Sequence, residues 1–202
     1  MRRQRRFWKG AVAGLAGGLA GTIAMTIFQK SWAATAKKLA EQNNGQQPNR
    51  NARGGESRDE SEDSTVKVAA KIASFAGTPL TTEQKKMGGS AVHYGFGATM
   101  GLLFGSLREI APYQAWRYPA LTGICFGTLV FLGADEIAVP SLNLSEKPSQ
   151  KSASEHAYEL AGHVIFGLTL GYITRAVRDR RWSESGSTAG RRRTGQCHEI
   201  FR

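Results

Sequence analysis

The amino-acid sequence predicts an all-α fold, a four-helix transmembrane bundle with glycine-rich helix packing, and three observations lead to it. Four stretches of about 20 residues are apolar enough to cross a bilayer. Glycine makes up 24 of the 202 residues, above its usual share of about 7%, and recurs at four-residue spacing. The net charge of +11 is concentrated at the two ends of the chain.

The four apolar stretches are predicted transmembrane helices at residues 10–28, 88–107, 119–138 and 153–174. The first has no charged residue over its nineteen positions, which is close to the length that a bilayer core requires. The second is interrupted only by His93, whereas the third has two acidic residues near its end and the fourth has four ionisable residues in its first half. Such residues are costly in lipid unless they face protein or water.

The charge distribution argues against a nucleic-acid-binding protein. Residues 1–9 hold five basic and no acidic residues, and residues 175–202 hold eight arginines against three acidic residues, which leaves +1 for the rest. A nucleic-acid-binding domain carries its basic residues on its folded surface. Basic ends beside apolar stretches are instead typical of the cytoplasmic flanks of transmembrane helices, and solvated tails are the alternative.

The same charges predict the orientation of a multi-pass membrane protein with both termini cytoplasmic. Residues 1–9 are then a basic cytoplasmic N-terminus, and residues 175–202 are a basic cytoplasmic tail that is largely disordered. Residues 29–87 form an external polar insert. A cleaved signal peptide is an alternative interpretation of the first apolar stretch.

The external insert is predicted to be partly disordered. Residues 41–64 are polar and lack hydrophobic periodicity, as disordered segments do. Residues 66–76 follow helical spacing and predict a short amphipathic helix, which either lies at the membrane surface or packs on the bundle. Thr81 and Gln84 fit a capping box, so the next helix is expected to begin before its transmembrane part.

Glycines at four-residue spacing occur in all four apolar stretches and predict faces where helix backbones approach closely. Lipid supplies no hydrophobic force between helices, so small residues that permit close contact favour their association. Packing within one bundle is the main interpretation, and oligomerisation is the alternative. The glycines are Gly10, Gly14, Gly18, Gly97, Gly101, Gly105, Gly123, Gly127, Gly167 and Gly171.

Ionisable residues inside the apolar stretches are the candidate functional site. In the fourth stretch they follow helical spacing and form a polar strip, and in the predicted topology all of them lie in the outer half of the membrane. Three helices therefore bring such groups to about the same depth, facing the bundle interior. The residues are His93, Asp135, Glu136, Glu155, His156, Glu159 and His163.

Three hypotheses account for these ionisable residues. Glu159 and His163 are four residues apart and can bind one metal ion, with His93, Asp135 or His156 completing the site. Histidines and carboxylates can also relay protons or other ions. Hydrogen bonds and ion pairs that fix the helix register are the third hypothesis. The sequence does not decide between them, and it identifies neither a metal nor a cofactor.

Nothing in the sequence indicates an enzyme. Patterns of Ser/His/Asp or Cys/His that would activate a nucleophile are missing, and so is a phosphate-binding loop of the Walker type. The two cysteines, Cys125 and Cys197, lie in an apolar stretch and in the tail, so we expect no disulfide between them.

The fourth apolar stretch resembles the last helix of the YagU-like family of uncharacterised bacterial inner membrane proteins. Residues 159–163 carry an E-x-x-G-H arrangement, followed by an apolar run and the basic segment 175–181. His93, followed by Phe96 and small apolar residues, is similar to a position in that family's second span. The resemblance implies a four-span inner membrane protein with a domain of unknown function, and it implies no established activity or cofactor.

The sequence therefore favours an integral inner membrane protein that handles protons or other ions through an outer-facing cluster of histidines and carboxylates. The alternative function is that of a non-catalytic structural or assembly protein. Such a protein would form a homo-oligomer or bind a partner through its glycine faces. In either case its surroundings are the lipid bilayer, and nucleic acid is not an expected partner.

Overall fold

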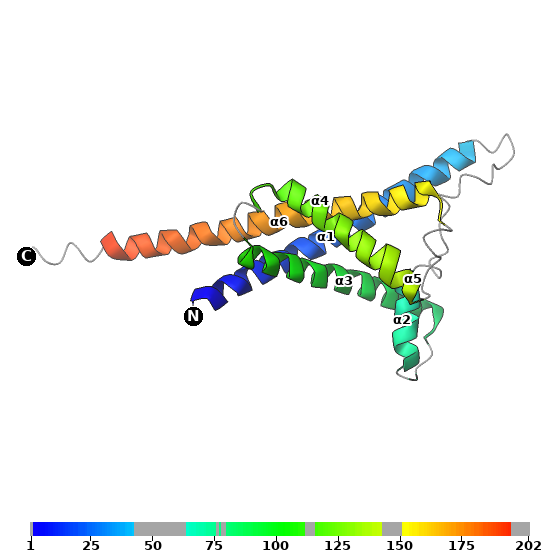
Figure 1. The fold of residues 1–202 in the computed structure, drawn as a ribbon, viewed down its shortest axis with the longest axis horizontal. Helices are drawn as coiled ribbons and strands as arrows, with labels where there is room; N and C mark the ends of the chain where they lie inside the picture. Colours follow the sequence, from blue (N-terminus) through cyan, green and yellow to red (C-terminus); the bar gives the residue numbers. More distant parts are fainter. Residues whose placement is uncertain are drawn as a thin grey trace, which may run out of the picture.

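The computed structural model describes residues 2–42, 64–75, 77, 80–111, 116–142 and 151–194. The regular structure of these residues is all helical, without a strand among them, which confirms the all-α part of the predicted fold class. The helices are α1 (Arg2–Gln42), α2 (Ser64–Phe75), α3 (Thr82–Ile110), α4 (Pro119–Val130), the π-helical segment η2 (Phe131–Ala138), α5 (Val139–Ser141) and α6 (Ala153–Thr194) (Figure 1).

Four long helical segments lie side by side and alternate in direction. Helix α1 packs against both α3 and α6, and α4 packs against α6. In Figure 1 the beginning of α1 and the end of α6 lie toward the same side of the molecule, whereas α2 and α5 lie at the opposite side. We call these the terminal end and the far end. A small core of Met25, Phe104, Phe166 and Leu170 fills the space between the helices.

Among the described residues, three helical stretches are long and apolar enough to cross a membrane: Phe7–Leu39, Pro119–Ser141 and Ala153–Asp179. They coincide with three of the four predicted transmembrane helices and suggest a membrane protein. The fourth prediction, residues 88–107, lies within α3, which is long enough but is not among the three. His93 and six glycines lower the apolar content of that segment.

The α1–α3 contact brings two backbones together at glycines. A Cβ atom added to Gly14 would lie 2.1 Å from the carbonyl oxygen of Gly101, and one added to Gly105 would lie 2.1 Å from that of Gly10. Real Cβ atoms do not approach oxygen so closely, so these positions admit only glycine without a shift of a helix. Backbones this close gain dispersion contacts and weak Cα–H···O hydrogen bonds.

The α4–α6 contact is built in the same way. A Cβ atom on Gly123 would lie 2.2 Å from the carbonyl oxygen of Gly167, and one on Gly127 would lie 2.2 Å from that of His163. A Cβ atom on Gly171 would meet the carbonyl oxygen of Pro119 at 2.3 Å. The contact therefore continues along most of α4 and fixes its position on α6.

The observed helices differ from the expected bounds at several ends. Helix α1 continues to Gln42, well past residue 28. The segment predicted as residues 119–138 changes from an α-helix to a π-helix at Phe131. Helix α6 continues to Thr194, where a largely disordered tail was expected. The tail has no proline that would end a helix. Most of the predicted disordered stretch 41–64 lies outside the described residues.

Helix α2 packs across the beginning of α3 by its narrow apolar face. Val66 and Ala69 are buried there, and Cβ atoms on Gly88 and Gly89 of α3 would collide with them. Phe75 at the other end of α2 is 85% exposed. Figure 1 shows α2 running across the direction of α3. The helix therefore packs on its neighbour and also presents an apolar side chain outward.

The predicted capping box at the start of α3 is confirmed. The backbone N–H of Gln84 donates to Thr81 Oγ1 at 3.3 Å, and the backbone N–H of Thr81 donates to Gln84 Oε1 at 2.9 Å. Two of the amide groups that a helix leaves without internal partners are satisfied in this way.

Ion pairs join α3 to α6 at the terminal end. Arg178 Nη2 donates to Glu109 Oε2 at 2.9 Å and Arg178 Nε donates to Glu109 Oε1, so that the pair is bidentate. The Glu109 side chain is only 5% exposed. Arg108 lies 4.0 Å from Asp179. Burial, and then the positive charge of Arg178, lowers the pKa of Arg108, which stays a cation because arginine starts from so high a value.

Adding one methyl group at a backbone contact should destabilise the protein, whereas the same change on an open helix face should not. Gly101→Ala places its Cβ 2.3 Å from the carbonyl oxygen of Gly14 and should cost about 1–3 kcal/mol through forced helix separation. Gly95→Ala in the same helix meets nothing within 4 Å and is the matched control. Unfolding of the purified protein in detergent measures both, and equal stability of the two variants would contradict the close contact.

Removing the buried charge at position 109 should also lower stability. Glu109→Gln keeps the size of the side chain but leaves Arg178 without its carboxylate, which should cost about 1–3 kcal/mol. Glu83→Gln, at an exposed position in the first turn of α3, should change the free energy of unfolding by less than about 0.5 kcal/mol. Unfolding experiments in detergent compare the two variants. If both have the same free energy of unfolding, the Glu109–Arg178 ion pair does not stabilise the protein.

Candidate functional site

The candidate site is a cluster of ionisable side chains at the far end of the α4–α6 contact. Asp135 and Glu136 come from η2, and His156, Glu159 and His163 come from the first three turns of α6. The two elements are held together by the glycine contact, whose last member, Gly127, lies against the backbone of His163. We call these five residues together with Lys151 the polar cluster.

Acidic and basic groups pair across the polar cluster. Lys151 Nζ donates to Glu159 Oε2 at 2.7 Å, and the Lys151 side chain is only 3% exposed. His156 Nδ1 lies 2.9 Å from Glu136 Oε1. Because three carboxylates face one lysine and two histidines, the polar cluster has an excess of negative charge whenever its histidines are neutral.

His163 is the most deeply buried histidine of the polar cluster. Its Nδ1 lies 3.0 Å from the backbone carbonyl oxygen of Glu159, and its Nε2 lies 3.5 Å from Asp135 Oδ2. Both neighbours offer oxygen atoms that can accept a hydrogen bond from the ring. The ring of Phe131 packs beside the imidazole, with centroids 5.6 Å apart, and forms an apolar wall.

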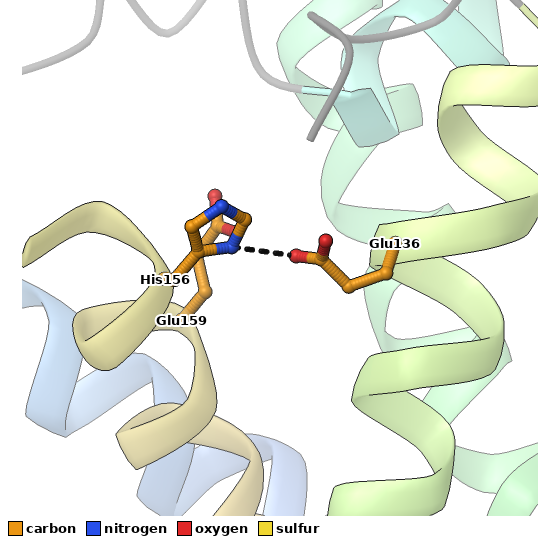
Figure 2. Close-up of side chains that lie close together, drawn as sticks. All are labelled: Glu136, His156 and Glu159. Carbon is orange, nitrogen blue, oxygen red and sulfur yellow. Dashed lines mark hydrogen bonds and ion pairs between the residues drawn. The ribbon is translucent and has the colours of Figure 1, made fainter. Parts of the chain in front are cut away.

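Three residues of the polar cluster point toward one another as metal ligands do. Figure 2 shows the imidazole of His156 facing the carboxylate of Glu136, with Glu159 one turn further along α6. One ligand atom from each of the three lies within 4.8 Å of the other two. Their side chains range from 14% to 31% exposed, so the group is sheltered but accessible to small ions.

Two of the seven predicted site residues contact neighbours outside the polar cluster. Glu155 accepts hydrogen bonds from the backbone N–H and the hydroxyl of Ser152, at 2.7 and 3.0 Å. Glu155 therefore caps the start of its own helix. His93 is on α3, where its ring meets that of Tyr94 edge-on, and the pairs of the polar cluster described above do not include it.

Sequence reasoning missed two features of the site. Lys151 lies outside the predicted apolar stretches, and nothing local indicates that its side chain folds back onto α6. The π-helical form of η2 also has no sequence signal, although it sets the directions in which Asp135 and Glu136 leave the helix. π-Helical turns are rare and often occur at functional sites.

Comparison with known proteins gives a family but no activity. No curated protein and no solved structure matches the chain. Residues 61–185 match the model of a family of unknown function, DUF6789, a stretch that contains α2, α3, α4 and the polar cluster. The resemblance to the YagU-like family implied a domain of unknown function, which the match confirms, and the kinship with YagU-like proteins stays a prediction. The chain belongs to the family of unknown function DUF6789.

Proposed function

We propose that this protein is a multi-pass membrane protein that handles cations through the polar cluster at its far end. The bundle has four membrane-crossing helices, with α3 as the fourth, and packs through its glycine faces. The apolar surface supports this placement, since soluble monomers rarely expose so much of it. Exposed apolar side chains on α1, α3 and the α4–η2 segment include Leu19, Ile23, Ile27, Leu102, Leu103, Leu121, Leu129, Leu132 and Ile137.

The orientation we propose places both termini in the cytoplasm of a bacterial cell and the polar cluster toward the outside. The beginning of α1 and the end of α6 lie toward the same side (Figure 1), as an even number of crossings requires. The terminal end carries the basic residues of the described segments 2–9 and 175–194, and cytoplasmic flanks are enriched in such residues.

The excess of carboxylates in the polar cluster is the observation that carries the proposal. Ionisable groups within membrane-crossing segments are expensive and are found where ions are bound or moved. The polar cluster contains three carboxylates, Asp135, Glu136 and Glu159, and one lysine, Lys151, which pairs with Glu159. A further cation would complete the charge balance, and the partial exposure of His156 leaves an entrance for it.

The alternative function, a structural protein that oligomerises through glycine faces, has less support. Gly14 and Gly101 already contact each other's helices, as do Gly123 and Gly167. A second copy or another protein would therefore have to use other surfaces of the helices.

Ion movement through reconstituted vesicles tests the proposed function. Protein in liposomes loaded with ion-sensitive dyes should admit at least one of K⁺, Mg²⁺, Mn²⁺ and Zn²⁺ faster than protein-free liposomes. Asp135→Asn should reduce that rate by about tenfold, as loss of one charged group in an ion path does, whereas Glu83→Gln should leave it unchanged. Rates equal to those of protein-free liposomes for every ion would refute the proposal.

A further inference from the structure

The group formed by Glu136, His156 and Glu159 has the composition of a transition-metal site. One imidazole nitrogen and two carboxylate oxygens are ligands that zinc and its first-row neighbours accept, whereas magnesium and calcium prefer oxygen alone. Ligand atoms about 2.1 Å from one ion are at most about 4.2 Å apart. The observed 4.8 Å limit therefore requires only a small inward movement of flexible side chains.

The backbone positions of these ligands are held by independent contacts. His156 and Glu159 are three residues apart on α6, so their side chains leave the same face of one helix. The carbonyl oxygen of Glu159 lies against the His163 imidazole at 3.0 Å, and η2 is fixed through the glycine contact of α4. Such support lets two helices present ligands from opposite sides of one ion.

A cation already lies at this group, namely the side chain of Lys151. Its ammonium nitrogen is 2.7 Å from Glu159 Oε2, and burial leaves only 3% of the side chain exposed. An ammonium group held in so little water must be stabilised by its counter-charge. A divalent ion that binds the same carboxylate carries twice that charge and would compete with Lys151 for it.

We propose that Glu136, His156 and Glu159 bind a divalent first-row transition-metal ion, and that Lys151 is a tethered cation that the metal displaces from Glu159. This inference rests on the proposed cation-handling function and names the class of cation. In the absence of metal, Lys151 then balances the negative charge of Glu159. Because it also competes with the metal for this carboxylate, only ions with affinity for imidazole replace it.

Equilibrium zinc binding to the purified full-length protein in detergent tests this inference, with Mg²⁺ as the comparison ion. The wild-type chain should bind one zinc ion and no magnesium at the same concentration. His156→Asn and Glu159→Gln should each weaken zinc binding by at least about tenfold. Lys151→Met, which removes the competing charge but keeps an unbranched side chain, should strengthen it by about fivefold or more. Glu83→Gln and Lys85→Met, at exposed positions on α3, are matched controls and should bind zinc as the wild type does.

Three results would overturn the inference. The first is that neither the wild type nor Lys151→Met binds zinc saturably. The second is that His156→Asn and Glu159→Gln leave zinc binding unchanged. The third is that Lys151→Met binds zinc more weakly than Lys85→Met does. Because Lys151→Met is expected to gain affinity, a loss caused by misfolding cannot imitate its predicted result. Vesicles that move ions without zinc binding in detergent would refute only this inference. Zinc binding without ion movement would refute only the proposed function.

Discussion

The contact of α4 with α6 through glycines is the constraint on which the candidate site depends. Side chains at Gly123, Gly127 and Gly167 would separate the two helices, because their Cβ atoms would collide with backbone carbonyl groups. Because the two backbones are this close, the short side chains of Asp135 and Glu136 reach the histidines of α6. Hydrophobic association cannot replace this contact within lipid, so the shape of small residues decides where the polar groups meet.

A sheltered carboxylate pairs with a basic side chain at both ends of the helices. At the terminal end Glu109 is bound by two nitrogens of Arg178, and at the far end Glu159 is bound by Lys151. The first pair joins helices far apart in the sequence, whereas Lys151 and Glu159 are eight residues apart and fix the start of α6. The two places differ in charge balance, since the terminal end has surplus arginines, whereas the polar cluster has three carboxylates and one lysine. For this reason we propose the additional cation at the polar cluster.

The sequence predicts features that depend on local spacing. Apolar stretches located the helices, and four-residue spacing identified both the glycines and the polar strip of α6. Two features of the site were not predictable from local spacing, namely the ion pair of Lys151 with Glu159 and the π-helical form of η2, which has no compositional signature. The hydrogen bonds between Glu155 and Ser152 are local, and their three-residue spacing could have indicated them. His93 was assigned to the site by depth alone, and its place there stays a prediction.

The candidate site requires that η2 contacts α6 at residues 136 and 156, and cross-linking in native membranes measures this contact. Glu136→Cys and His156→Cys are combined in a chain whose Cys125 and Cys197 are replaced by serine, and a short bifunctional thiol reagent is added. We expect an intramolecular link, which is lost when Gly127→Leu separates the helices. A His156→Cys and Asp179→Cys pair, about 34 Å apart along α6, is the control. If residues 136 and 156 are linked no faster than that control pair, η2 and α6 do not meet there.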